Sequence, residues 1–243
     1  MHTRIPFRFL GRIPEDDPLH QVIPISALDL GPAPQCVNVP GVGCVPQYAP
    51  TVYGNHDGFD PATDCQGYFT LFKFQMHNNC YNYALDIASN SMAQPGQMHG
   101  MVRQGDFDGD RVIEGALLDG LKLLGERGVR LSDALEQAAD LDGGSLVALL
   151  MAPPDDSVDV DFPGDFHWVR CDDLKSSSWS HKAGTDQVSK LDFAGVPIAD
   201  PSCAAWSLNA GPRNPTKPGS PDFLTAYEFR AWMFVPDTGV DII

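Results

Sequence analysis

The sequence predicts an α+β protein in which helices come first along the chain and strands follow. Three observations support this prediction. The 243 residues are 43% hydrophobic, which is enough for one domain with a buried core. The prolines divide the chain, with ten in residues 1–70, one in residues 71–150 and ten in residues 151–243. Within the proline-poor middle, helical periodicity gives way to short apolar runs that are typical of strands.

Residues 1–70 are expected to form an extended arm rich in proline and glycine. The central segment, GPAPQCVNVPGVGCVPQYAP, lacks helical periodicity and is typical of a chain laid over a surface or of short edge strands. Cys36 and Cys44 bracket a short loop in this segment, and whether they form a local disulfide is left open. The first residues show no classical secretory signal, and no apolar stretch approaches the length of a membrane-spanning helix. A soluble protein of unknown compartment is therefore expected.

Residues 71–243 are expected to form the α+β domain, which ends in an irregular C-terminal extension. A first helix starts near Asn78 or Asn79, either of which can cap it, and Cys80 lies in its first turn. Apolar residues at steps of three and four predict two further helices, and β-branched or aromatic runs predict four strands, the last of which returns to the same sheet. The expected helices are 111–126 and 132–141, and the expected strands are 145–151, 166–171, 179–182 and 227–235.

The charge balance is strongly acidic, and almost all of the acid is aspartate. The formal net charge is −16, with 27 Asp against 5 Glu. Aspartate favours turns and helix caps, so this excess indicates many loops. A basic surface that could follow phosphates is absent, and nucleic acid and anionic membranes are therefore not expected as partners. A neutral or cationic substrate or partner suits this surface better.

Three side chains occur where a cysteine hydrolase needs them. Cys80 opens a helix, where backbone N–H groups and the helix dipole favour a thiolate. His167 lies in FHWVRC, in which strand alternation puts His167, Val169 and Cys171 on one face. If this segment forms a hairpin with SWSHK about Leu174, His167 lies directly opposite His181, close enough for one ring to orient the other. A slip of one residue would put His181 on the far face.

The segments NNCYNYAL, DFHWVRCD and WSHKAGT resemble, in order, the three active-site elements of the papain-like cysteine peptidases and amidases, especially NlpC-type endopeptidases and CHAP amidases. The resemblance covers roughly residues 72–185 at the level of motifs. It departs from the compact family in the insert 90–145, the arm and the C-terminal extension. It implies a papain-like core in which N-terminal helices pack on an antiparallel β-sheet, with no cofactor.

The resemblance also implies a role for each site residue. Cys80 would attack a carbonyl carbon, His167 would transfer the proton, and His181 would orient His167. The backbone N–H of Cys80 would form an oxyanion hole with a second donor from a polar side chain just before it. The candidates for that second donor are Gln75, Asn78 and Asn79.

Simpler interpretations compete for the same residues. Cysteine is often a small buried apolar residue, which alone would explain Cys80. The pairs His77 with Cys80 and His167 with Cys171 have spacings feasible for zinc, although neither is a paired-cysteine signature. The segment DFDGDRVIE places aspartates at alternate positions, as in a calcium loop, but the glycine and glutamate positions of an EF-hand do not match. A solvated loop that caps the following helix is favoured there.

Two functions from different classes follow. The leading hypothesis is a papain-like thiol protease or amidase, a hydrolase that cleaves an amide bond in a peptide or cell-wall peptide through Cys80, His167 and His181. The alternative is a structural or partner-binding assembly protein that retains a degenerate hydrolase fold. In this second hypothesis, residues 1–70 bind a protein partner or further copies of the chain. Insertion into a membrane is not expected in either case.

Overall fold

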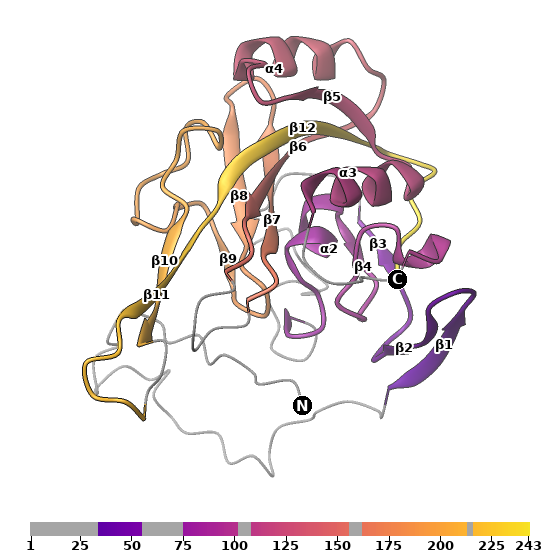
Figure 1. Cartoon of the computed structure of the whole chain (residues 1–243). Coiled ribbons are helices and arrows are strands. Elements are labelled where there is room, and N and C mark those ends of the chain that lie inside the picture. The colour runs from indigo at the N-terminus through magenta and orange to yellow at the C-terminus, as the bar shows by residue number, and fades with distance from the viewer. Residues whose placement is uncertain (1–33, 55–74, 102–107, 156–161, 213–215) are drawn as a thin grey trace, which may run out of the picture.

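The computed structural model describes residues 34–54, 75–101, 108–155, 162–212 and 216–243. Its centre is a six-stranded antiparallel sheet, in which the last strand of the chain lies between strands from the middle of the sequence (Figure 1). Across the sheet, the strands follow the order β5 (Lys122–Glu126), β12 (Glu228–Pro236), β6 (Gly144–Ala152), β7 (Asp165–Asp173), β8 (Ser178–Lys182) and β9 (Val188–Ser189).

Both faces of the sheet are covered, which explains why β6 is a continuous apolar run. Helices α2 (Cys80–Leu85) and α3 (Gly109–Leu118) pack on one face, against Val147 and Leu149. Helix α4 (Leu131–Ala139) packs on the other face, with Leu146 and Ala148. Strands that are buried on both faces lose the alternation of apolar and polar residues. No helix of the described residues is long and apolar enough to cross a membrane.

The four predicted strands and the third predicted helix are confirmed to within two residues at each end. The prediction that the last strand returns to the same sheet is also confirmed, since β12 pairs with both β5 and β6. These segments were predictable because their burial is strong and their apolar runs are bounded by turn residues.

The predicted fold class, a papain-like core with N-terminal helices on an antiparallel sheet, is wrong. The described residues form mostly strands, and the first helix, α2, ends after six residues at Asp86, which adopts a left-handed backbone with φ of 55°. The chain then forms β4 (Ile87–Ala88), which pairs with β3 (Val52–Tyr53).

The second predicted helix is also too long. Helix α3 ends at Leu118, and Gly120 turns the chain with φ of 106°. The apolar steps of three and four continue past this point, but Lys122–Glu126 pairs as β5 with β12, over a hundred residues away along the sequence. Local periodicity contains no information about such a partner, so tertiary pairing overrides it.

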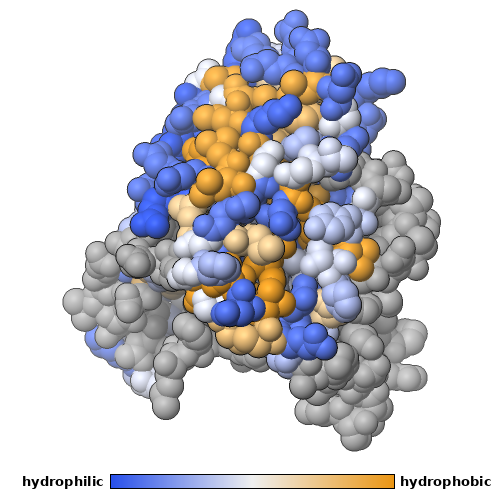
Figure 2. Space-filling view, turned by 90° about the vertical axis from the view of Figure 1, so that its right-hand side faces the viewer, coloured by the Kyte–Doolittle hydropathy of each residue, from blue (hydrophilic) through white to orange (hydrophobic). Residues whose placement is uncertain are grey.

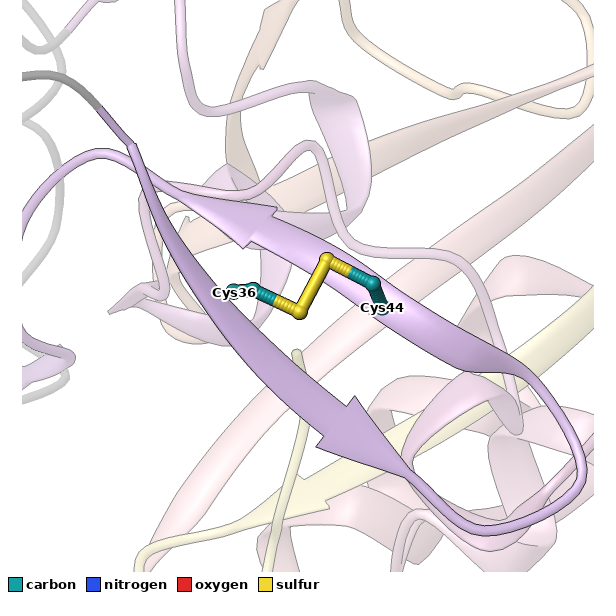
Figure 3. Close-up of a disulfide and its surroundings, with 2 residues drawn as sticks. All are labelled: Cys36 and Cys44. Carbon is teal, nitrogen blue, oxygen red and sulfur yellow. A yellow bond between two sulfur atoms is a disulfide. The ribbon is translucent and has the colours of Figure 1, made fainter.

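The described part of the predicted arm, residues 34–54, contains a β-hairpin and the short strand β3. Strands β1 (Gln35–Val39) and β2 (Gly43–Gln47) pair in antiparallel register, and the Cys36–Cys44 disulfide joins them (Figure 3). Val39 and Val45 are buried against the C-terminal Ile243. The rest of the arm lies outside the described residues, apart from β3. A second hairpin, of β10 (Ser207–Pro212) and β11 (Asp222–Ala226), lies apart from the central sheet (Figure 1).

Candidate functional site

The central sheet separates the three predicted catalytic side chains into two groups. Along β7, Phe166 and Trp168 point to the face covered by α2 and α3, where they pack with Cys80. His167 points to the opposite face, where its ring lies beside Trp206. The backbone of β7 therefore lies between the Cys80 sulfur and the His167 ring. The structure brings the two histidines together and leaves the cysteine on the other side.

The two histidines form a hydrogen-bonded pair, although their strands pair in a different register from the predicted one. His181 lies opposite Val169, two residues further along β7 than His167. A shift of two residues preserves the face, because side chains alternate with a period of two. The rings therefore remain diagonal neighbours, and His167 Nε2 lies 2.9 Å from His181 Nδ1.

The hydrogen bonds determine the tautomer of each ring. His181 Nε2 lies 2.8 Å from the carbonyl oxygen of Leu191, which only accepts, so this nitrogen carries the proton. His181 Nδ1 is then the acceptor, and the N–H of His167 Nε2 donates to it. Burial lowers the pKa of both rings, and for His167 the neighbouring His181 lowers the pKa further. Both imidazoles are thus neutral at physiological pH.

Aromatic side chains close the space around this pair. Phe193 and Trp206 contact both histidine rings, and Tyr227 packs against His167. Tyr227 in turn donates its hydroxyl to Asp165, at 2.7 Å. Both histidines are 3% exposed, so a substrate does not reach them in this conformation.

Cys80 lies in an environment that opposes thiolate formation. Its thiol is 5% exposed and faces the Phe166 carbonyl oxygen at 3.9 Å. Burial, followed by the nearby Asp165 carboxylate, raises its pKa to about 12. The position at the start of α2 was expected to lower the pKa, but removal of the thiol from water outweighs the dipole of a six-residue helix. Cys80 is therefore a protonated thiol in the core.

Lys182 is the charged neighbour of Cys80 that the sequence prediction missed. Its side chain is fully buried and donates to the carbonyl oxygens of Asn78 and Gly184. Burial lowers the pKa of this ammonium group to about 7, and Cys80 and Asp186 act against that shift. Alternation along SWSHK could have identified this neighbour, because it places Lys182 on the face opposite His181, towards α2.

The three candidate oxyanion donors are already engaged by the protein. The Gln75 amide donates to the Thr185 carbonyl oxygen at 3.1 Å, and the Asn78 amide donates to the Asn90 side chain at 3.0 Å. Asn79 is confirmed as the N-cap of α2, and its amide donates to the Ala93 carbonyl oxygen at 2.7 Å. Asn78 and Asn79 thus bind the segment after α2 to the helix start, and Gln75 binds the segment after β8, which is a structural use of their polar groups.

The four candidate zinc ligands do not lie together in the structure. Cys171 lies on the same face of the sheet as His167, and Cys80 lies on the other face. His77 stacks on Tyr48, with 3.8 Å between the ring centroids. Among the described residues, no three metal-binding side chains form a cluster. The expected cap is present at Asp108, which accepts from the main chain of Asp110 at 3.0 Å. Asp106, the first aspartate of the segment, lies outside the described residues.

The described part of the chain is a β-rich protein whose central sheet separates two closed polar clusters. One is the pair His167 and His181, and the other contains Asn78, Asn79 and Lys182. No family model matches the chain, and no solved structure matches it. Insoluble matrix shell protein 1 of Ruditapes philippinarum is 34% identical over 148 residues, which cover 57% of this chain and 83% of that protein. The chain belongs to the family of this shell matrix protein.

This relationship corrects the functional prediction. A relative that is a matrix protein fits the structural alternative, and the interpretation as a hydrolase, thiol protease or amidase has no support from it. The relative does not test the resemblance to papain-like peptidases, which remains a likeness of three short motifs.

Proposed function

We propose that this chain is a structural protein of an extracellular matrix, in which it assembles with further copies or with other matrix proteins. The relationship to insoluble matrix shell protein 1 is the observation that carries this proposal. The Cys36–Cys44 disulfide supports it, because disulfides persist in oxidising compartments outside the cytosol.

The closed clusters support the same function. The buried amides of Asn78 and Asn79 and the imidazoles of His167 and His181 all bond to protein groups. Satisfied buried polar groups specify a rigid core, whereas a catalytic centre keeps groups available for a substrate. The chain therefore contributes a stable folded unit to the assembly.

The test follows the full-length protein in the tissue that produces it and in solution. Antibodies against the chain should detect it in the extracellular fraction that resists detergent extraction. Sedimentation of the purified protein should show association that increases with ionic strength, because a net charge of −16 makes copies repel one another when screening is weak. A protein that stays inside cells and remains monomeric at every concentration and salt would refute the proposal.

The predicted arm can be tested separately. A chain without residues 1–33 retains the hairpin β1–β2 and the Ile243 that it contacts, and we expect it to fold. Association should fall if these residues bind neighbouring molecules. A chain in which residues 1–33 are scrambled in order controls for their composition and charge. Unchanged association of the truncated chain would show that binding resides elsewhere, while the matrix location could still hold.

A further inference from the structure

The carboxyl group of Asp119 is a buried junction between three parts of the chain. Asp119 is 1% exposed and caps the end of α3. Its Oδ2 accepts the Tyr81 hydroxyl of α2 at 2.8 Å and the Gly96 main-chain N–H at 2.7 Å. Its main-chain carbonyl oxygen accepts the N–H of Asp241, in the C-terminal segment, at 3.1 Å. Within the described residues, Oδ1 has no hydrogen-bond partner.

The segments that meet at Asp119 are the ones on which the disulfide hairpin rests. Gly96 precedes the 3₁₀ turn η3 (Gln97–His99), and Met98 of this turn packs against the Val39 and Val45 cluster together with the C-terminal Ile243. The turn of the hairpin also approaches the chain just after η3 closely, since a Cβ on Gly41 would lie 3.3 Å from the Gly100 carbonyl oxygen. The surface on which the hairpin packs, formed by η3 and the C-terminal segment, therefore depends on groups that Asp119 holds in place.

The opposite end of the hairpin has its own attachment. The main-chain N–H of Tyr48 donates to the Asn90 carbonyl oxygen at 2.9 Å, and the Gln47 amide donates to the Ser89 carbonyl oxygen at 2.9 Å. Loss of the contacts at the turn would thus let the hairpin swing about residues 47–48 without leaving the molecule.

Burial favours the neutral form of the Asp119 carboxyl, and the groups that face it shift its pKa in both directions. Tyr81 faces it from α2, His99 from η3 at 3.6 Å between Nε2 and Oδ1, and Asp241 from the C-terminal segment. Burial raises the pKa of Asp119 to about 7, the hydrogen bonds from Gly96 and Tyr81 lower it, and the Asp241 carboxylate raises it. A raised pKa means that the folded arrangement is most stable with the proton bound, and this stability is lost as the pH rises from about 4, the ordinary aspartate pKa, through about 7.

We propose that Asp119 is a proton-controlled latch for the disulfide hairpin. In its neutral form the carboxyl group holds η3 and the C-terminal segment together, and the hairpin turn docks on them. When the group ionises, the buried carboxylate draws water into the junction. The contacts of η3 and the C-terminal segment with the hairpin weaken, and residues 39–45 undock. This regulation goes beyond the proposed structural function and does not depend on it.

Hydrogen exchange of the full chain tests the latch. Protection factors, which correct for the intrinsic effect of pH, are measured between pH 4 and pH 9. We expect the protection of residues 39–45 to fall by up to about tenfold for each pH unit between about 4, the ordinary aspartate pKa, and about 7, and to level off above that. Amides of β6 and β7 should keep their protection, which separates local undocking from global unfolding. Constant protection of residues 39–45 over this range would overturn the proposal.

Two variants identify the group that titrates. Asp119→Asn imitates the neutral form, because its amide oxygen can accept both bonds made by Oδ2, and it should abolish the pH dependence. Asp140→Asn, at an exposed position after α4, is the matched control and should behave as the wild type. If Asp119→Asn folds and retains the wild-type pH profile, another group is responsible and the latch is refuted.

Tyr81→Phe provides a second test that does not remove the carboxyl group. It deletes one donor that stabilises the ionised form, so the midpoint of undocking should move to higher pH. A midpoint that stays in place, or moves to lower pH, would contradict the assignment to Asp119 even if Asp119→Asn fails to fold.

Discussion

Alkylation of the native protein distinguishes a buried structural thiol from a catalytic one at Cys80. The perturbation is iodoacetamide at pH 8, and only the thiolate form reacts. With a pKa of about 12, roughly one Cys80 thiol in ten thousand is ionised at pH 8, against about one in four for an ordinary cysteine of pKa ~8.5. Ionisation alone therefore slows the reaction about a thousandfold. Burial slows it further, because the 5% exposed thiol must open to solvent.

Peptide mass spectrometry over a time course measures the rate at each thiol. Cys171 is a matched internal control, because burial raises its pKa to about 12 as well, and Cys203 is exposed. Among the three free cysteines of the described residues, we expect Cys203 to react first, with Cys80 and Cys171 reacting together only as the protein unfolds. Unfolded protein should label all three at similar rates. Selective, rapid labelling of Cys80 in the native state would refute this description of the site and restore the nucleophile.

Three further predictions concern stability. Asn82→Ala should lower the free energy of unfolding in urea by about 3 kcal/mol or more, because it removes four buried hydrogen bonds and leaves buried partners unsatisfied; a loss below about 1 kcal/mol would contradict this role. Because the pKa values of His167 and His181 are lowered in the folded state, the unfolded chain binds protons at these residues more readily below pH 6.5. Each residue should therefore lower the free energy of unfolding by up to about 1.4 kcal/mol for each pH unit below 6.5. When His181 is replaced by Gln, the urea midpoint should fall less between pH 6.5 and acid pH than it does in the wild type. Gly120→Ala should cost about 2 kcal/mol or more in thermal unfolding, because φ is 106° and the new Cβ would lie 2.3 Å from the Gly239 carbonyl oxygen; a stability equal to the wild type would show that the turn adapts.

The candidate site shows where sequence reasoning succeeded and where it failed. Alternation within FHWVRC and SWSHK predicted that His167 and His181 share a face, and the structure brings them within 2.9 Å despite a register shift of two residues. The same alternation predicted nothing about Cys80, because the face of β7 on which α2 packs depends on the path of the chain between them. The three motifs resembled an active site in order and residue type, while their geometry placed the sulfur and the imidazole on opposite sides of a strand.

Local features of this protein can be derived from its amino-acid sequence alone. The apolar runs specified β6 and β12, Asn79 and Asp108 specified helix starts, and the excess of aspartate indicated loops and caps. These features depend on neighbours within a few residues, which one sequence displays. Only the tertiary structure decided that β12 lies between β5 and β6, that Asp119 joins three distant segments, and that two of the three predicted catalytic residues face away from the third. Those contacts join residues far apart along the chain, and the burial they create sets the pKa of Cys80, His167 and Asp119 more strongly than any local pattern does.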